Sequence, residues 1–100
     1  MVIHQPRVVW DGARAFVFAA YHPEFEDFAG RVITRLGPDI YGELANTRQR
    51  LLAALVQTGG DRGPTDLETG RWRVRLDELL RSRPDLTPAV QDLTSIALEL

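Results

Sequence analysis

The sequence predicts an all-α protein: a compact bundle of four or five short amphipathic helices in a single domain over residues 1–100. Apolar residues recur every three or four positions through most of the chain, which is the period of a helix. Glycine and proline pairs divide the chain into segments of helical length. The proportions of 44% hydrophobic and 26% charged residues are typical of a chain that folds.

The segment from Val8 to Pro23, VVWDGARAFVFAAYHP, fits two structures. Asp11-Gly12 between apolar runs is typical of a β-hairpin, which would occupy residues 7–18 and make the domain α+β. As a helix, the same segment gathers five apolar residues on one face: Val9, Ala13, Phe16, Val17 and Ala20. Its alanines favour a helix, and an isolated two-stranded ribbon is only marginally stable in water. The helix is therefore our prediction, and the hairpin is the alternative.

A second helix is predicted over residues 24–36. Pro23 stands where a helix start tolerates proline, and acidic residues in the first turn suit the positive end of the helix dipole. Gly37-Pro38 ends the segment. The predicted core face consists of Phe25, Phe28, Ala29, Val32, Ile33 and Leu36.

A third helix is predicted over residues 39–57, with Asp39 as its N-cap and Gly59-Gly60 as its end. Its apolar stripe consists of Ile40, Leu44, Leu51 and Leu55, widened by Tyr41, Leu52 and Val56. The segment TGGDRGPTD, residues 58–66, has the composition of turns and is predicted to be a flexible loop.

The last two helices are predicted over residues 66–82 and 87–100. Pro84 ends the first of them, and Thr87-Pro88 is a typical helix start. The first is expected to bury Leu67, Trp72, Leu76, Leu79 and Leu80. The second is expected to bury Ala89, Val90, Leu93, Ile96, Ala97 and Leu100. The short break between them predicts a helical hairpin or a bent pair.

Composition excludes several classes of function. The chain has no cysteine, so it has no disulfide, thiol nucleophile or thiolate metal site. No apolar run approaches the roughly 20 residues of a membrane span, and the N-terminal residues are too polar for a signal peptide. A cytoplasmic protein is therefore expected. The net charge of −2 gives no general reason to expect nucleic acid or an acidic membrane as partner.

The C-terminal third, RWRVRLDELLRSRPDLTPAVQDLTSIALEL from Arg71 to Leu100, has a tryptophan, a leucine pair, a proline break and a closing helix with leucines. This arrangement resembles small helical modules of actinobacterial proteins, some of which are adaptor domains of bacterial conflict and signalling systems. The resemblance covers about the last third of the chain and implies a helical hairpin. It implies no catalytic residues.

Two segments contain residue types that could bind a ligand. His22 lies near Glu24, Glu26 and Asp27, which together offer an imidazole and carboxylates to a cation. The helix dipole explains these acids without a metal. The loop segment TGGDRGPT, residues 58–65, lacks the lysine and following hydroxyl residue of a phosphate-binding P-loop. We therefore predict no catalytic, cofactor-binding or metal-binding residue, with a small ligand-binding or catalytic bundle around His22 as one alternative.

Five arginines of the C-terminal third could together form a surface for nucleic acid. It consists of Arg71, Arg73, Arg75, Arg81 and Arg83. Five acidic residues between Asp66 and Asp85 balance these five arginines, and several stand at ion-pair spacing. Because phosphate binding needs uncompensated positive charge, a self-paired solvated face is the preferred interpretation. A helical nucleic-acid-binding regulator that uses this face is a second alternative.

Arg48 falls inside the apolar stripe of the third helix. A buried, unpaired guanidinium is costly, so its side chain is expected to reach solvent or a carboxylate. The candidates are Glu26 of the second helix or an acid of a partner chain.

Phe18 and Val74 are apolar residues on faces that should be exposed. If Trp10 and Tyr21 adjoin Phe18, the three form an aromatic patch of the kind enriched in interfaces. The predicted interface residues are therefore Trp10, Phe18, Tyr21, Arg48 and Val74. The predicted function is non-enzymatic protein–protein interaction, as an adaptor, assembly or regulatory module that binds a protein partner or itself as a homo-oligomer.

Overall fold

The computed structural model describes residues 5–60 and 62–100, and this part of the chain contains only helices and the turns that join them. The elements are α1 (Gln5–Tyr21), α2 (Phe25–Leu36), α3 (Pro38–Thr58), α4 (Gly63–Ser82), the short 3-10 helix η1 (Pro84–Leu86) and α5 (Thr87–Leu98). The predicted all-α bundle is confirmed. The alternative hairpin over residues 7–18 is wrong, because these residues lie within α1.

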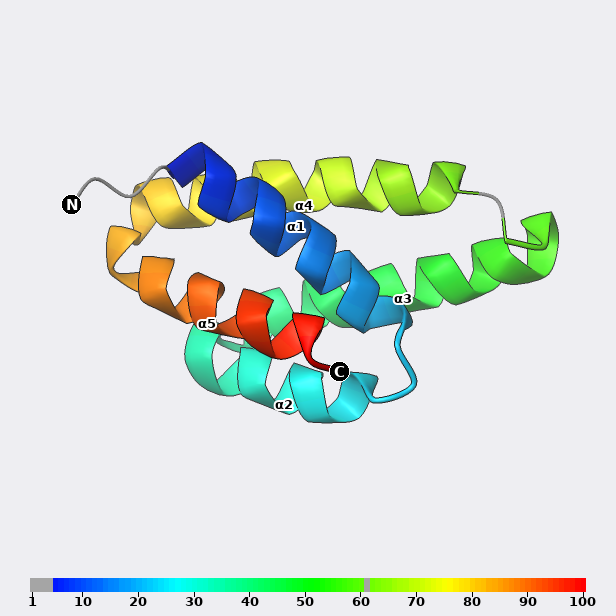
Figure 1. Cartoon of the computed structure of the whole chain (residues 1–100), viewed down its shortest axis with the longest axis horizontal. Helices are drawn as coiled ribbons and strands as arrows, with labels where there is room; N and C mark the ends of the chain where they lie inside the picture. The colour runs from blue at the N-terminus through cyan, green and yellow to red at the C-terminus, as the bar shows by residue number, and fades with distance from the viewer. Residues whose placement is uncertain (1–4, 61) are drawn as a thin grey trace.

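Helix α1 is the central element, and it packs against α4, α5 and α3 (Figure 1). Its small side chains allow this, because four alanines and Gly12 are buried among the larger core residues of the bundle. A Cβ atom at Gly12 would lie 3.1 Å from both Leu76 Cδ1 of α4 and Val90 Cγ1 of α5. The glycine of the Asp11-Gly12 pair therefore permits a close helix crossing and makes no turn.

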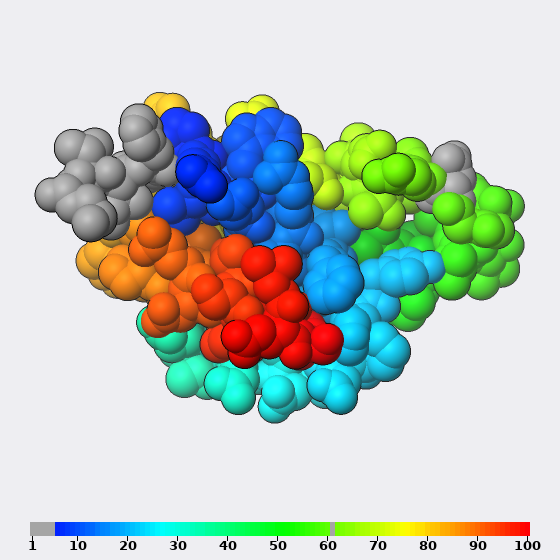
Figure 2. Space-filling model, viewed as in Figure 1, coloured from blue at the N-terminus to red at the C-terminus, as the bar shows by residue number. Residues whose placement is uncertain are grey.

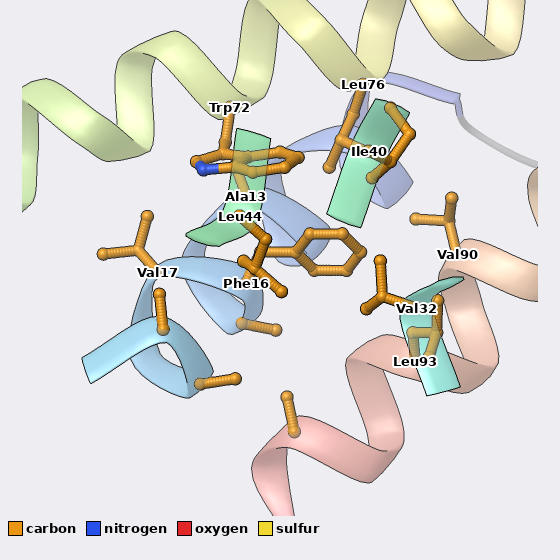
Figure 3. Packing of buried hydrophobic residues seen from close by; sticks show 14 of the residues in the cluster. Ala13, Phe16, Val17, Val32, Ile40, Leu44, Trp72, Leu76, Val90 and Leu93 are labelled. Carbon is orange, nitrogen blue, oxygen red and sulfur yellow. The ribbon is translucent and has the colours of Figure 1, made fainter. Parts of the chain in front are cut away.

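Phe16 lies at the centre of the hydrophobic core (Figure 3). Its ring centroid is 5.5 Å from that of Phe28 in an edge-to-face arrangement and 5.2 Å from that of Trp72. Such aromatic pairs add to the free energy of burial. Other large, fully buried side chains come from all remaining α-helices: Val32, Ile40, Leu44, Leu76, Leu80, Val90 and Leu93. Phe16 thus ties α1 to α2 and α4.

The C-terminal half of α3 and the N-terminal half of α4 project beyond the rest of the bundle (Figure 1). By their residue counts α3 is about 32 Å long and α2 only about 18 Å, so α2 cannot cover the whole of α3. The predicted stripe of α3 is buried as far as Leu51, whereas Leu52, Leu55 and Val56 are exposed. The molecule measures 44 × 24 × 24 Å.

Two further predictions of burial are wrong. Leu67 is exposed because it lies at the projecting end of α4, and the neighbouring Glu68 is buried in its place. Ile33 is also exposed, on the outer side of α2. Four other residues predicted in the core are only partly buried: Leu36, Leu79, Ile96 and Leu100.

The loop predicted over residues 58–66 is shorter in the structure. Helix α3 ends at Thr58, and Gly59 and Gly60 adopt positive φ angles of 70° and 108° that break the helix. Helix α4 already begins at Gly63, with Pro64 in its first turn, where the fixed φ of proline favours a helix. Within the described residues, none of the helices combines the length and apolar character needed to cross a membrane.

Candidate functional site

Helix α4 has a concave surface on each side. We call the hollow between α1 and the first turns of α4 the aromatic groove; it has a volume of about 860 Å³, and its wall includes Trp10, Arg14, Phe18, Tyr21, Arg62 and Thr69. Figure 2 shows the surface hollowed between these elements. We call the hollow between α3 and α4 the charged groove; it has a volume of about 730 Å³, and its wall includes Glu43, Thr47, Arg50, Glu68, Trp72 and Val74.

The aromatic groove contains three of the predicted interface residues, Trp10, Phe18 and Tyr21. Each of these side chains is between 41% and 48% exposed. They stand together because most of α1 is buried against other helices, which leaves one narrow exposed stripe along it. Positions 10, 14, 18 and 21 follow that stripe at helical spacing. The three aromatic residues that the sequence singled out therefore line one groove.

Arginines surround Trp10. The guanidinium carbons of Arg14 and Arg73 lie 5.4 and 5.2 Å from its ring centroid, within the range of cation–π attraction. Arg14 Nη1 also lies 3.3 Å from Asp11 Oδ1. At the other end of the groove, Arg62 is exposed, and among residues 5–60 and 62–100 no carboxylate lies within ion-pair distance of it.

The charged groove is built around Glu68, which is only 3% exposed. Both of its carboxylate oxygens accept hydrogen bonds from Arg50, at 2.8 Å from Nε and 2.8 Å from Nη2. Arg71 Nη1 lies 3.4 Å from the same carboxylate. The hydrogen bond to Glu68 raises the pKa of the Arg50 guanidinium. Paired in this way, the buried carboxylate ties α3 to α4.

Two further contacts in the charged groove also join α3 to α4. The buried hydroxyl of Thr47 accepts a hydrogen bond of 2.9 Å from Trp72 Nε1. Arg75 Nε donates to both carboxylate oxygens of Glu43, at 2.9 and 2.8 Å. These contacts use most of the polar groups of the groove wall internally, and Asn46, Asp66 and Glu78 of the same wall take no part in them. The sequence indicated the Glu68–Arg71 spacing, but it gave no sign that Glu68 is buried or that Arg50 and Glu43 take part.

Arg48 does not bind the carboxylate of Glu26 that was considered as its partner. Its Nη1 donates to the backbone carbonyls of Ala20 at 2.9 Å and His22 at 3.0 Å, at the end of α1. Its guanidinium also lies 4.8 Å from the ring centroid of Phe25. The expected carboxylate partner is therefore wrong, because the Arg48 guanidinium binds backbone carbonyls of the same chain. These hydrogen bonds satisfy donors of Arg48, so an unsatisfied guanidinium no longer argues for its place in the predicted interface.

Val74 is exposed, as predicted, but it lines the charged groove and not the aromatic groove. The predicted interface residues therefore do not share one surface. The arginine face is largely ion-paired: Arg81 with Asp77, at 2.9 Å, and Arg83 with Asp85, at 2.8 Å, join the pairs already described.

His22 is engaged at the turn between α1 and α2. Its Nδ1 accepts a hydrogen bond of 3.1 Å from the backbone N–H of Glu24, and its ring centroid lies 5.6 Å from that of Phe18. Among the side chains that the structure describes, no group of three histidine or acidic residues is arranged to hold a metal ion.

Comparisons with protein-family models, with curated proteins and with solved structures find no match to this chain. The resemblance of residues 71–100 to actinobacterial helical modules therefore stays a prediction.

Proposed function

We propose that the protein is a non-enzymatic protein-interaction module, in an adaptor, assembly or regulatory role, and that the aromatic groove is its docking surface. The observation that carries the proposal is the position of Trp10, Phe18 and Tyr21 on one concave surface between two helices. Tryptophan and tyrosine dominate the binding free energy of many interfaces because they bury large areas with few rotatable bonds.

The contrast with the other surfaces supports this choice. In the charged groove the polar side chains bind one another, so a partner there would have to displace existing hydrogen bonds. In the aromatic groove, burying three half-exposed rings would release water without breaking a hydrogen bond that the structure describes for those rings. The partner is a protein chain, either another protein or a second copy of this one.

Affinity capture from a lysate of the source cells tests the proposal, with nuclease treatment and mass spectrometry. The unchanged protein is expected to retain a protein partner after nuclease, and Phe18→Asp is expected to lose it because a carboxylate would enter the apolar wall. Ile33→Asp is the matched control, since Ile33 is similarly exposed on α2.

The same partner bound equally by the unchanged protein and by Phe18→Asp would exclude the aromatic groove as the docking surface. Retention that disappears with nuclease would favour the alternative of nucleic-acid binding through the arginine face. Sedimentation of both variants then shows whether the partner is a second copy of the chain.

A further inference from the structure

The charges around the aromatic groove differ in balance from those of the whole chain. Three guanidiniums line the groove or contact its Trp10 ring, compared with one carboxylate in its wall and one paired with Arg14: Arg14, Arg62 and Arg73, with Asp66 and Asp11. The whole chain has a net charge of −2. The groove is therefore a locally basic surface on an acidic protein.

Two of these guanidiniums have no carboxylate partner among residues 5–60 and 62–100. Arg62 makes no ion pair there, and Arg73 lies against the ring of Trp10. Most other arginines of the described chain have a carboxylate within 4.0 Å, as Arg31, Arg35 and Arg75 do. Arg62 and Arg73 thus offer donors to carboxylates of another chain.

The shape of the groove suits a helix. Its aromatic residues extend from position 10 to position 21 of α1, which is about 16 Å or three helical turns. The opposite wall is a second helix, the start of α4. A groove between two helices with apolar residues at helical spacing is the usual receptor for an amphipathic helix, whose residues i, i+3, i+4 and i+7 enter it.

We infer that the occupant of the aromatic groove is an amphipathic helix of another protein that has acidic residues beside its apolar face. Its apolar side chains contact Phe18 and Tyr21, and its carboxylates bind Arg62 and Arg73. This inference rests on the proposed function, and it adds the chemistry of the partner.

The charge also argues against the two other occupants. A second copy whose groove lay on the axis of a twofold dimer would place one basic groove against another, because a twofold interface uses the same patch on both subunits. A nucleic acid strand needs a row of uncompensated positive charges for its successive phosphates, whereas only Arg62 and Arg73 of the groove's guanidiniums lack a carboxylate partner among residues 5–60 and 62–100, which suits two carboxylates of one helix.

The test uses two fluorescent helical peptides of about 18 residues, both with leucines at i, i+3, i+4 and i+7. One has glutamates beside the leucines, and the other has lysines at the same positions. By fluorescence anisotropy the glutamate peptide is expected to bind at least about tenfold more tightly than the lysine peptide, and less tightly as salt is raised. Arg62→Glu is expected to weaken its binding about tenfold, whereas Arg31→Glu on α2 leaves it unchanged.

Equal binding of the two peptides, or an unchanged affinity of Arg62→Glu, would overturn the inference. The inference would also be overturned if a labelled oligothymidylate bound more tightly than the glutamate peptide. A homodimer whose dissociation constant fell in Arg62→Glu would overturn it as well. If the peptides bind equally while capture still depends on Phe18, the interaction function stands and only the acidic helix is wrong. If capture does not depend on Phe18 either, both proposals fail.

Discussion

The two sides of α4 differ in how their polar groups are satisfied. In the charged groove, Arg50, Arg75 and Trp72 donate to Glu68, Glu43 and Thr47. In the aromatic groove, rings stand half exposed and Arg62 has no carboxylate partner in the described chain. The two hollows are similar in volume, at about 730 and 860 Å³. Volume therefore does not distinguish them. They differ in the interactions that remain available to a partner: exposed rings and an arginine without a carboxylate in the aromatic groove, and mostly bonded polar groups in the charged groove.

The difference means that the same kind of substitution should change the stability of the protein by very different amounts on the two sides. Arg50→Ala is expected to destabilise the protein by about 3 kcal/mol, because it leaves the buried carboxylate of Glu68 with only the longer contact to Arg71. Urea denaturation followed by circular dichroism measures this change in the free energy of unfolding.

Arg62→Ala is the matched control on the other side. It should change the free energy of unfolding by less than about 0.5 kcal/mol, since an exposed side chain without an ion pair stabilises little. The double variant Arg50→Met with Glu68→Met should recover most of the lost stability, because apolar side chains often replace a buried ion pair at no cost. Equal losses for Arg50→Ala and Arg62→Ala would remove the distinction between the grooves.

A smaller effect is expected at the Thr47–Trp72 hydrogen bond. Thr47→Val keeps the shape of the side chain but leaves the buried Trp72 N–H without its acceptor, at a cost of about 2 kcal/mol. Thr69→Val in the aromatic groove is the control, since the hydroxyl of Thr69 donates only to the carbonyl of Thr65 in its own helix. Thermal denaturation should show a clear fall in Tm for the first variant and almost none for the second.

The sequence predicted the fold well where periodicity and helix-ending residues agreed. The bounds of α2 and α5 lie close to those predicted, because Gly37-Pro38 and Thr87-Pro88 mark them locally. The Asp11-Gly12 pair was ambiguous, because a turn and a close helix crossing both require glycine. Only the side chains of α4 and α5 decide between the two, and these lie more than 60 residues further along the chain.

The candidate site was predictable only in part. Phe18 was predicted as an interface residue because it is apolar and lies on an exposed face, and it lines a groove with Trp10 and Tyr21. The opposite wall comes from α4, and a single sequence cannot show which helix packs beside α1. The burial of Glu68 was not predictable either, since a glutamate beside an arginine has the same pattern on a solvated face.

The smallest expected effect concerns the pair of Arg83 and Asp85, which has two hydrogen bonds like that of Arg50 and Glu68 but lies in water. The hydrogen bond from Arg83 lowers the pKa of Asp85 below its ordinary value of 3.8. A lowered folded-state pKa means that the pair stabilises the fold above the unfolded pKa and loses this contribution as the pH falls through the folded pKa.

Asp85→Asn should therefore lower Tm slightly at about pH 7, and this effect should shrink as the pH falls from 3.8 through the lower folded-state pKa of Asp85. Titration of the Asp85 carboxyl by NMR should give a midpoint below 3.8 that returns to it in Arg83→Gln. A loss of stability as large as that of Arg50→Ala would show that the geometry of a bidentate pair matters more than its burial. A loss of stability near zero for Asp85→Asn would show that the burial of Glu68 causes the difference between the two pairs. Solvent screens the charges of Asp85 and Arg83 and can replace their hydrogen bonds.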